Sequence, residues 1–188
     1  MNPITHALIG WTAAQRICTT RRDTAIVTLA SIIPDFDGVG GVVDLITSGS
    51  RNPTTFYSDY HHVFGHNITA DVIFSILAAI FSREKIKTGV FALLIYHLHL
   101  FCDIIGSKGP DGYQWPIDFF YPFYRGFELT WSGQWEVNAN QNIATTVAFL
   151  FLAFKQARDL GFSPLWYFSE KADQAFVETI RTRFPIRK

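Results

Sequence analysis

The feature that most constrains the fold is an apolar run from Gly89 to Ile105 that contains two histidines and one aspartate. The run predicts a buried helix that begins after a charged turn at residues 83–85. On this helix His99 and Asp103 are four residues apart and therefore lie on one face, one turn above the other. A neutral imidazole and a carboxylate at this spacing can bind one cation together, which would account for polar groups in an apolar helix. A histidine hydrogen-bonded to an aspartate in a core has the same pattern, so the pair alone leaves both interpretations open.

The other candidate metal ligands precede or share this helix. Asp35 and Asp37 lie two residues apart in a Pro-Asp-Phe-Asp-Gly turn, where two acidic groups can also be ordinary solvated turn formers. Histidines and carboxylates beside apolar segments are costly to bury unless they bind something, so the whole set favours a metal site over scattered structural histidines. The six histidines are His6, His61, His62, His66, His97 and His99.

Helix signals recur along the chain and predict an all-α fold, a single compact bundle of about six helices in one domain, residues 1–188. Asn2 followed by Pro3 predicts the start of the first helix. Pro34 ends the second, because the residue before a proline is pushed out of the α region. Gly161 ends the fifth helix and Ser169 caps the last. The expected helices cover residues 2–18, 23–32, 61–82, 86–105, 139–160 and 169–184.

Helical geometry ranks the histidines. His62 and His66 share a face if their helix has already begun, whereas His61 and His66 are five residues apart and converge less well. The spacing alone therefore does not decide whether His61 or His62 shares the site with His66. His97 lies about 200° around the helix from His99, so we expect it to face away from the site.

The composition changes between Pro110 and Glu136, where ten of 27 residues are aromatic and no helical period persists. A loop of this length is uncommon in a compact domain and is typical of a lid or the wall of a binding site. Packing over the end of the core is an equally good interpretation. We expect Trp115 and Trp131 in this long aromatic-rich loop to contact a substrate.

Composition and charge exclude some classes of function. The formal net charge is zero and the pI is near 7.0, so the chain has no electrostatic footprint for nucleic acid. Cys18 and Cys102 are far apart, which favours free thiols in a reducing compartment. No signal peptide is evident. The charge-free apolar runs, residues 72–82, 89–102 and 143–154, are shorter than the roughly 20 residues that span a bilayer. We therefore expect a cytoplasmic protein, or one in peripheral contact with the inner membrane face.

Five short motifs in order, within roughly residues 3–120, resemble those of the membrane-bound metal-dependent hydrolases, a family associated with the inner membrane. The family pattern is T-H-x-x-x-G, P-D-x-D, H-R-G-x-T-H-S, H-x-x-x-D and W-P. In this chain the matching stretches begin at Thr5, Pro34, His61, His99 and Trp115. A fainter likeness is to zinc-dependent phospholipase C and the P1-type nucleases, which are also all-helical.

The resemblance implies a ligand set and chooses between the neighbouring histidines. It selects His61, because His62 stands where the family has Arg, and it leaves His97 outside the motif. We assign His62 to substrate binding. Gly65 and Asn67 replace the family's Thr and Ser, and the family's long spanning helices are not evident. The implied metal ligands are His6, Asp35, Asp37, His61, His66, His99 and Asp103.

Together the motifs and the resemblance predict a metal-dependent hydrolase of an ester, and we favour a phosphoester. The ligands exceed what one tetrahedral zinc needs, so we expect a divalent metal, zinc or manganese, as one to two ions or more. Asp103 is the expected bridging carboxylate. Of the catalytic pair Asp35 and Asp37, one would bind metal and the other would position or deprotonate the attacking water. The expected partner is a small-molecule or lipid-like ester. The alternatives are a metal-binding sensor without turnover and a membrane-associated structural protein.

Overall fold

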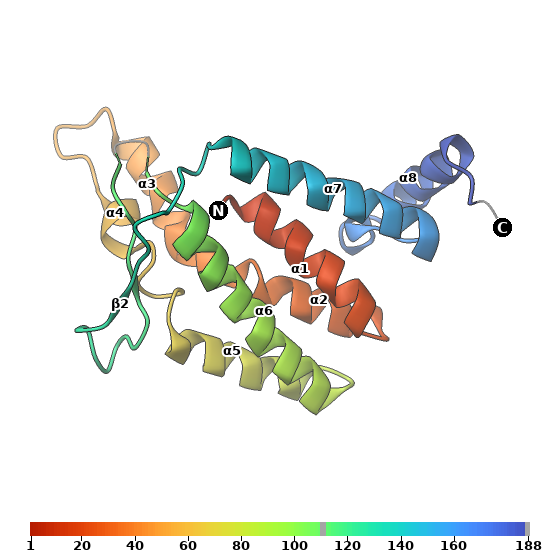
Figure 1. Ribbon diagram of the computed structural model, residues 1–188, viewed down its shortest axis with the longest axis horizontal. Coiled ribbons are helices and arrows are strands. Elements are labelled where there is room, and N and C mark those ends of the chain that lie inside the picture. The colour runs from red at the N-terminus through yellow and green to blue at the C-terminus, as the bar shows by residue number, and fades with distance from the viewer. Residues whose placement is uncertain (110–111, 187–188) are drawn as a thin grey trace.

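The computed structural model describes residues 1–109 and 112–186 and shows an all-α protein, as the sequence predicts (Figure 1). The only sheet among these residues is a pair of two-residue strands. The elements are α1 (Pro3–Ile17), α2 (Arg21–Ala30), the 3-10 helix η1 (Ile33–Val39), α3 (Gly40–Thr47), α4 (Phe56–Tyr60), α5 (Ile68–Phe81), α6 (Lys85–Gly106), β1 (Ile117–Asp118), β2 (Glu128–Leu129), α7 (Asn140–Leu160), the 3-10 helix η2 (Pro164–Tyr167) and α8 (Glu170–Arg183).

Capping residues and a glycine set three helix boundaries at the positions predicted from the sequence. The Asn2 side chain accepts a hydrogen bond from the backbone N–H of Thr5 at 2.9 Å and caps α1. Gly161 ends α7 with a left-handed φ of 84°, a conformation that costs glycine little. The Ser169 side chain accepts from the backbone N–H of Ala172 and caps α8.

Two helical hairpins form the centre of the bundle. Helix α1 packs against α2, α5 packs against α6, and α2 joins the hairpins by packing against α6. The core between them contains small side chains, including Ala14, Ala30, Ala78 and Ala92, which let the helices approach closely. Helix α7 lies against α1. One end of this bundle therefore gathers the start of α1, the end of α2, the start of α5 and the end of α6 (Figure 1).

The stretch around the middle histidines is not part of a long helix. The sequence predicts a helix from His61, but α4 ends at Tyr60 and α5 begins only at Ile68. His62 has a left-handed φ of 70°, which breaks the helical path, and the Asn67 side chain caps α5 by accepting from the backbone N–H of Ala70. The expected loop at residues 35–38 forms η1 and leads directly into α3.

The aromatic segment has both of the roles that its composition suggests. Pro110 and Asp111, with which the predicted segment begins, lie outside the described residues. Strands β1 and β2 pair antiparallel with Ile117 opposite Leu129, and fully buried Ile117 packs on Tyr96 and Leu100 of α6. This part covers the core. The part around Trp115 lines a cavity, described below.

Helix α6 is longer than the charge-free run that it contains. The charge-free run ends at Cys102, but the helix has 22 residues, because it begins at Lys85 and continues beyond Asp103 to Gly106. Within the described ranges it is the one helix long and apolar enough to cross a bilayer, and α2 with the bent η1–α3 segment would make a second. The expectation that no apolar segment reaches spanning length is therefore wrong for α6.

Candidate metal centre

Four segments bring the predicted ligands together at one end of the bundle. The first turns of α1 carry His6, and η1 carries Asp35 and Asp37. The turn between α4 and α5 carries His61, His62 and His66, and the last turns of α6 carry His99 and Asp103. Residues separated by almost one hundred positions in the sequence thus share one site.

The centre of the site is a cluster of Asp35, His66, His99 and Asp103, whose candidate ligand atoms all lie within 4.8 Å of one another. Oδ2 of Asp103 lies 2.9 Å from Nε2 of His99 and 3.3 Å from Nε2 of His66. Oδ1 of Asp35 lies 3.7 Å from Nε2 of His99 and 3.9 Å from Nε2 of His66. The two imidazoles and Asp103 are buried, and Asp35 is partly exposed.

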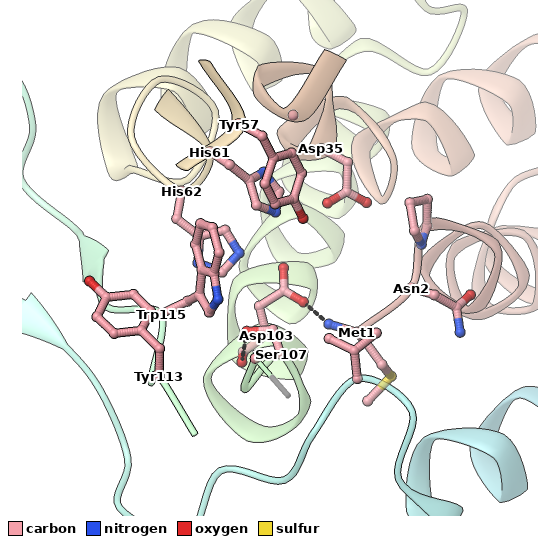
Figure 2. Close-up of a pocket in the computed structure, with 14 residues that line it drawn as sticks. Met1, Asn2, Asp35, Tyr57, His61, His62, Asp103, Ser107, Tyr113 and Trp115 are labelled. Carbon is pink, nitrogen blue, oxygen red and sulfur yellow. Dashed lines mark hydrogen bonds and ion pairs between the residues drawn. The ribbon is translucent and has the colours of Figure 1, made fainter. Parts of the chain in front are cut away.

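The second oxygen of Asp103 faces a different group. Its Oδ1 lies 3.0 Å from Nε2 of His6, whose ring stacks on that of His99 with centroids 3.8 Å apart. The amino group of Met1 also contacts this oxygen (Figure 2). Asp103 therefore presents one oxygen to His66 and His99 and the other to His6. This is the arrangement that a bridging carboxylate needs.

Asp37 lies behind the cluster and orients its histidines. Its Oδ2 accepts hydrogen bonds from Nδ1 of His66 at 2.9 Å and from the backbone N–H of Gly65 at 3.0 Å. Its Oδ1 accepts from Nδ1 of His61 at 2.8 Å. A carboxylate on the far nitrogen of a histidine fixes the ring and its tautomer, a common arrangement behind metal ligands. The structure thus places Asp37 as the support of two predicted ligands and not among the clustered ligand atoms.

The backbone carbonyl of Ser31, at the C-terminal end of α2, orients His99. Nδ1 of His99 donates to the carbonyl oxygen of Ser31 at 2.9 Å. In His66 and His99 alike, the Nδ1 atom is therefore occupied and the Nε2 atom faces the cluster.

A second group of possible ligands includes a residue that the sequence motif passes over. His61, His62 and His66 offer nitrogens within 4.8 Å of one another. His62, which we assign from the sequence to substrate binding, is buried, and its Nδ1 has no hydrogen-bond partner among the described residues. Its position follows from the left-handed turn at His62, which no spacing rule for a helix describes. The structure therefore adds His62 to the candidate ligands.

A cavity of about 550 Å³ opens onto these residues (Figure 2). Asp35, His61, His62 and Asp103 are among the residues that line it. Its walls also include aromatic residues and a serine, some of which sequence patterns alone do not single out: Tyr57, Ser107, Tyr113 and Trp115.

Of the two predicted substrate tryptophans, only Trp115 lines the cavity. Trp115 packs edge-on against His61 and His62, with ring centroids 5.4 Å apart in both pairs. Trp131 packs against Trp135 and is 45% exposed. Tyr57 stacks on His61 with ring centroids 4.5 Å apart, and an isolated tyrosine in an irregular stretch has no signal that would identify it.

His97 faces away from the site, as helical geometry predicts. Its Nδ1 contacts the buried carboxylate of Asp71 on α5, which also accepts a hydrogen bond from Ser75 at 3.0 Å. The structure thus assigns the two neighbouring histidines of α6 to different surroundings.

Comparison with known proteins shows the family. A family model described as YdjM inner membrane protein matches residues 1–169. The chain belongs to the YdjM inner membrane protein family. No curated protein and no solved structure matches it. The YdjM match contains every candidate ligand and the whole aromatic segment, and it supports the inner-membrane association that the motifs imply.

The buried polar atoms of this YdjM family member fit a bound cation. Oδ2 of Asp35 is buried without a hydrogen-bond donor in the part of the chain that the structure describes, and buried Oδ2 of Asp103 faces the imidazole nitrogens of His66 and His99. Such atoms are costly unless a positive group meets them. Imidazole nitrogens and carboxylate oxygens are ligands of zinc and manganese, so the donor set agrees with the predicted metals.

The electrostatics of the site lead to the same conclusion. Burial lowers the pKa of His66, but its hydrogen bonds to Asp103 and Asp37 outweigh burial and raise this pKa to about 9. Burial and the neighbouring His66 lower the pKa of His62 well below its usual range and keep that ring neutral. A proton on His66 thus provides, in the metal-free protein, positive charge where the carboxylates require it.

The support given by Asp37 leads to a prediction for the Asp37→Asn variant. An amide in place of the carboxylate cannot accept from both histidine rings and Gly65 with the same strength, so we expect metal affinity to fall by about 10- to 100-fold with the fold intact. Competition with a chromophoric chelator measures this change. Asp59→Asn, on the exposed part of α4, is the control and should bind like the unaltered protein. Equal affinity of Asp37→Asn and Asp59→Asn would contradict the assignment.

Proposed function

We propose that this YdjM family member is a metal-dependent hydrolase that cleaves a phosphoester at the cluster of Asp35, His66, His99 and Asp103. The observation that carries the proposal is the Asp103 carboxylate, which lies between three imidazoles and lines a cavity of about 550 Å³. A site that only stabilises a fold is usually closed, whereas a catalytic site keeps a position open to substrate.

The residues divide into ligands and supports. The cluster would hold one divalent ion, His61 and His62 would complete a second position that shares His66, and His6 would bind an ion bridged by the other oxygen of Asp103. Such ions, when bound, polarise the phosphoryl oxygen and lower the pKa of water. Asp37 and the Ser31 carbonyl hold the rings in place, so that little reorganisation is needed on binding.

Asp35 is our candidate for the general base. It lines the cavity, it is the most exposed member of the cluster, and its Oδ2 has no hydrogen-bond donor in the described part of the chain. A carboxylate in this position can accept the proton of a water that attacks a substrate held in the cavity. The walls made by Tyr57, Tyr113 and Trp115 would contact the apolar part of a small-molecule or lipid-like ester.

The proposal predicts a metalloprotein with turnover. Protein purified in detergent without chelator should carry zinc or manganese at more than one equivalent, and it should hydrolyse bis(p-nitrophenyl) phosphate or p-nitrophenyl phosphate. Elemental analysis and release of p-nitrophenol measure the two properties separately. Bound metal with no hydrolysis of either ester would favour a sensor without turnover, and protein that neither carries nor takes up metal would end the proposal.

A further inference from the structure

The bundle end opposite the candidate metal centre is formed by three chain connections that touch one another. The Asp23 carboxylate, at the start of α2, accepts hydrogen bonds from the backbone N–H groups of Arg83 and Glu84 in the α5–α6 turn. The hydroxyl of Tyr167 in η2 donates to the carbonyl oxygen of Arg21 at 3.0 Å. The α1–α2 turn, the α5–α6 turn and the α7–α8 connection therefore meet at this end, which we call the basic end.

Cationic side chains gather at the basic end. The α1–α2 and α5–α6 turns, with the adjoining ends of α1, α2 and α6, contribute exposed or partly exposed cations. The end of α7 adds Lys155 and Arg158, and α8, which follows it, carries three more. Arg187 and Lys188 lie outside the described residues. The cations of the two turns are Arg16, Arg21, Arg22, Arg83, Lys85 and Lys87.

The end that carries the metal centre has fewer lysine and arginine residues. Its described lysine and arginine residues are Arg51, Lys108 and Arg125, which come from the segments between α3 and α4 and between α6 and α7. Acidic residues outnumber them there, even without the carboxylates of the site itself. These further acids are Asp44, Asp59, Asp118, Glu128 and Glu136.

Between the two ends, the outer faces of the helices are apolar. The only Asp, Glu, Lys or Arg on α5, on α6 between Lys87 and Asp103, or on α7 before Lys155 is Asp71, which is buried against His97. Large apolar side chains on these helices are exposed, among them Ile73 at 55%, Ile80 at 58%, Phe101 at 57% and Phe151 at 69%. Apolar faces of this extent are costly in water.

The length of the apolar zone approaches that of a bilayer. From Lys87 to Asp103, α6 rises about 24 Å at roughly 1.5 Å per residue, against a hydrocarbon thickness of about 30 Å. Exposed aromatic side chains continue beyond it at the site end, where Phe123 is 85% exposed and Trp131 is 45% exposed. Aromatic residues are enriched where a membrane meets water. Trp131 does not line the cavity, and this position assigns it to the membrane–water interface instead.

We propose that the bundle is inserted in the inner membrane with the basic end at the cytoplasmic face and the metal centre at the periplasmic face. Short cytoplasmic segments of inner membrane proteins carry an excess of Lys and Arg, and anionic headgroups attract such segments. The occupant of the exposed faces of α5, α6 and α7 is thus lipid. The orientation does not depend on catalysis. Combined with the proposed function, it means that the phosphoester substrate reaches the site from the periplasmic side.

Two cysteine variants test the orientation in a background that carries Cys18→Ser and Cys102→Ala. Thr19→Cys lies in the exposed α1–α2 turn at the basic end, and Ser50→Cys lies in the exposed loop after α3 at the site end. A membrane-impermeant maleimide should label Ser50→Cys in spheroplasts and Thr19→Cys only after lysis. In inside-out vesicles the order should reverse. Labelling of Thr19→Cys in spheroplasts, or of both variants only after lysis, would overturn the orientation.

A second measurement distinguishes lipid from a protein partner. Lipid on the exposed faces predicts that the protein stays in the membrane fraction after washing with alkaline carbonate, and release by this wash would overturn the proposal. Neither measurement uses metal or turnover, so the orientation can fail while the hydrolase proposal holds, and the reverse. Thermal melting of the cysteine background in detergent, compared with the unaltered protein and measured first, shows that its fold is intact.

Discussion

Asp103→Asn and His99→Ala should each remove most of the bound metal and lower phosphoester hydrolysis by at least about 100-fold, because even residues behind a ligand typically change metal affinity by 10- to 100-fold. Asp103 contacts His6 with one oxygen and His66 and His99 with the other. The asparagine variant is the stricter test, since it keeps the shape of the side chain and removes only the charge that two cations would share. Elemental analysis and p-nitrophenol release measure both effects.

His97→Ala is the matched control for these variants. His97 is on the same helix, two residues from His99, but contacts Asp71 on the side away from the cavity. We expect it to keep the metal and to lose about 1–3 kcal/mol of stability, because the buried Asp71 carboxylate loses a partner. If His97→Ala empties the site while His99→Ala leaves it filled, the assignment of the metal centre to this face of α6 is wrong.

Gly10→Ala should disturb the site from a distance. An added Cβ on Gly10 would lie 2.0 Å from the Oγ and 2.5 Å from the Cβ of Ser31, so α1 and α2 would have to separate. The carbonyl of Ser31 is the acceptor that orients His99, and its displacement should weaken metal binding. We expect about 1–3 kcal/mol of lost stability, typical of overpacking between well-packed elements. Thermal melting in detergent and chelator competition measure the two losses.

A second substitution should rescue this variant. Ser31→Gly removes both atoms that the new Cβ would meet, so Gly10→Ala combined with Ser31→Gly should regain most of the stability and metal affinity. Gly49→Ala is the control for a loss of glycine alone, because no heavy atom lies within 4 Å of its added Cβ. Failure of the double variant to recover either property would contradict the proposed contact between α1 and α2.

Boundaries and faces of the helices could be predicted because they depend on neighbours in the chain. Asn2 caps α1 and Gly161 ends α7, since each acts on a hydrogen bond or a backbone angle within a few residues. The four-residue spacing of His99 and Asp103 likewise places both in the cluster, and the two-residue spacing sends His97 to Asp71. Helical geometry thus fixes which of these side chains share a face of α6.

The roles of other residues depended on contacts between segments that are far apart in the sequence. Asp37 looks like Asp35 in the sequence, but packing of η1 against the turn before α5 directs it to the Nδ1 atoms of His61 and His66. His62 joins the candidate ligands through a left-handed turn, and Trp131 lies away from the cavity lining. The chain by itself determined the helices and most of the candidate ligands. Only the tertiary structure decided which side chains share a cavity, which stand behind the ligands, and that the cations gather at one end, because these depend on how distant segments pack.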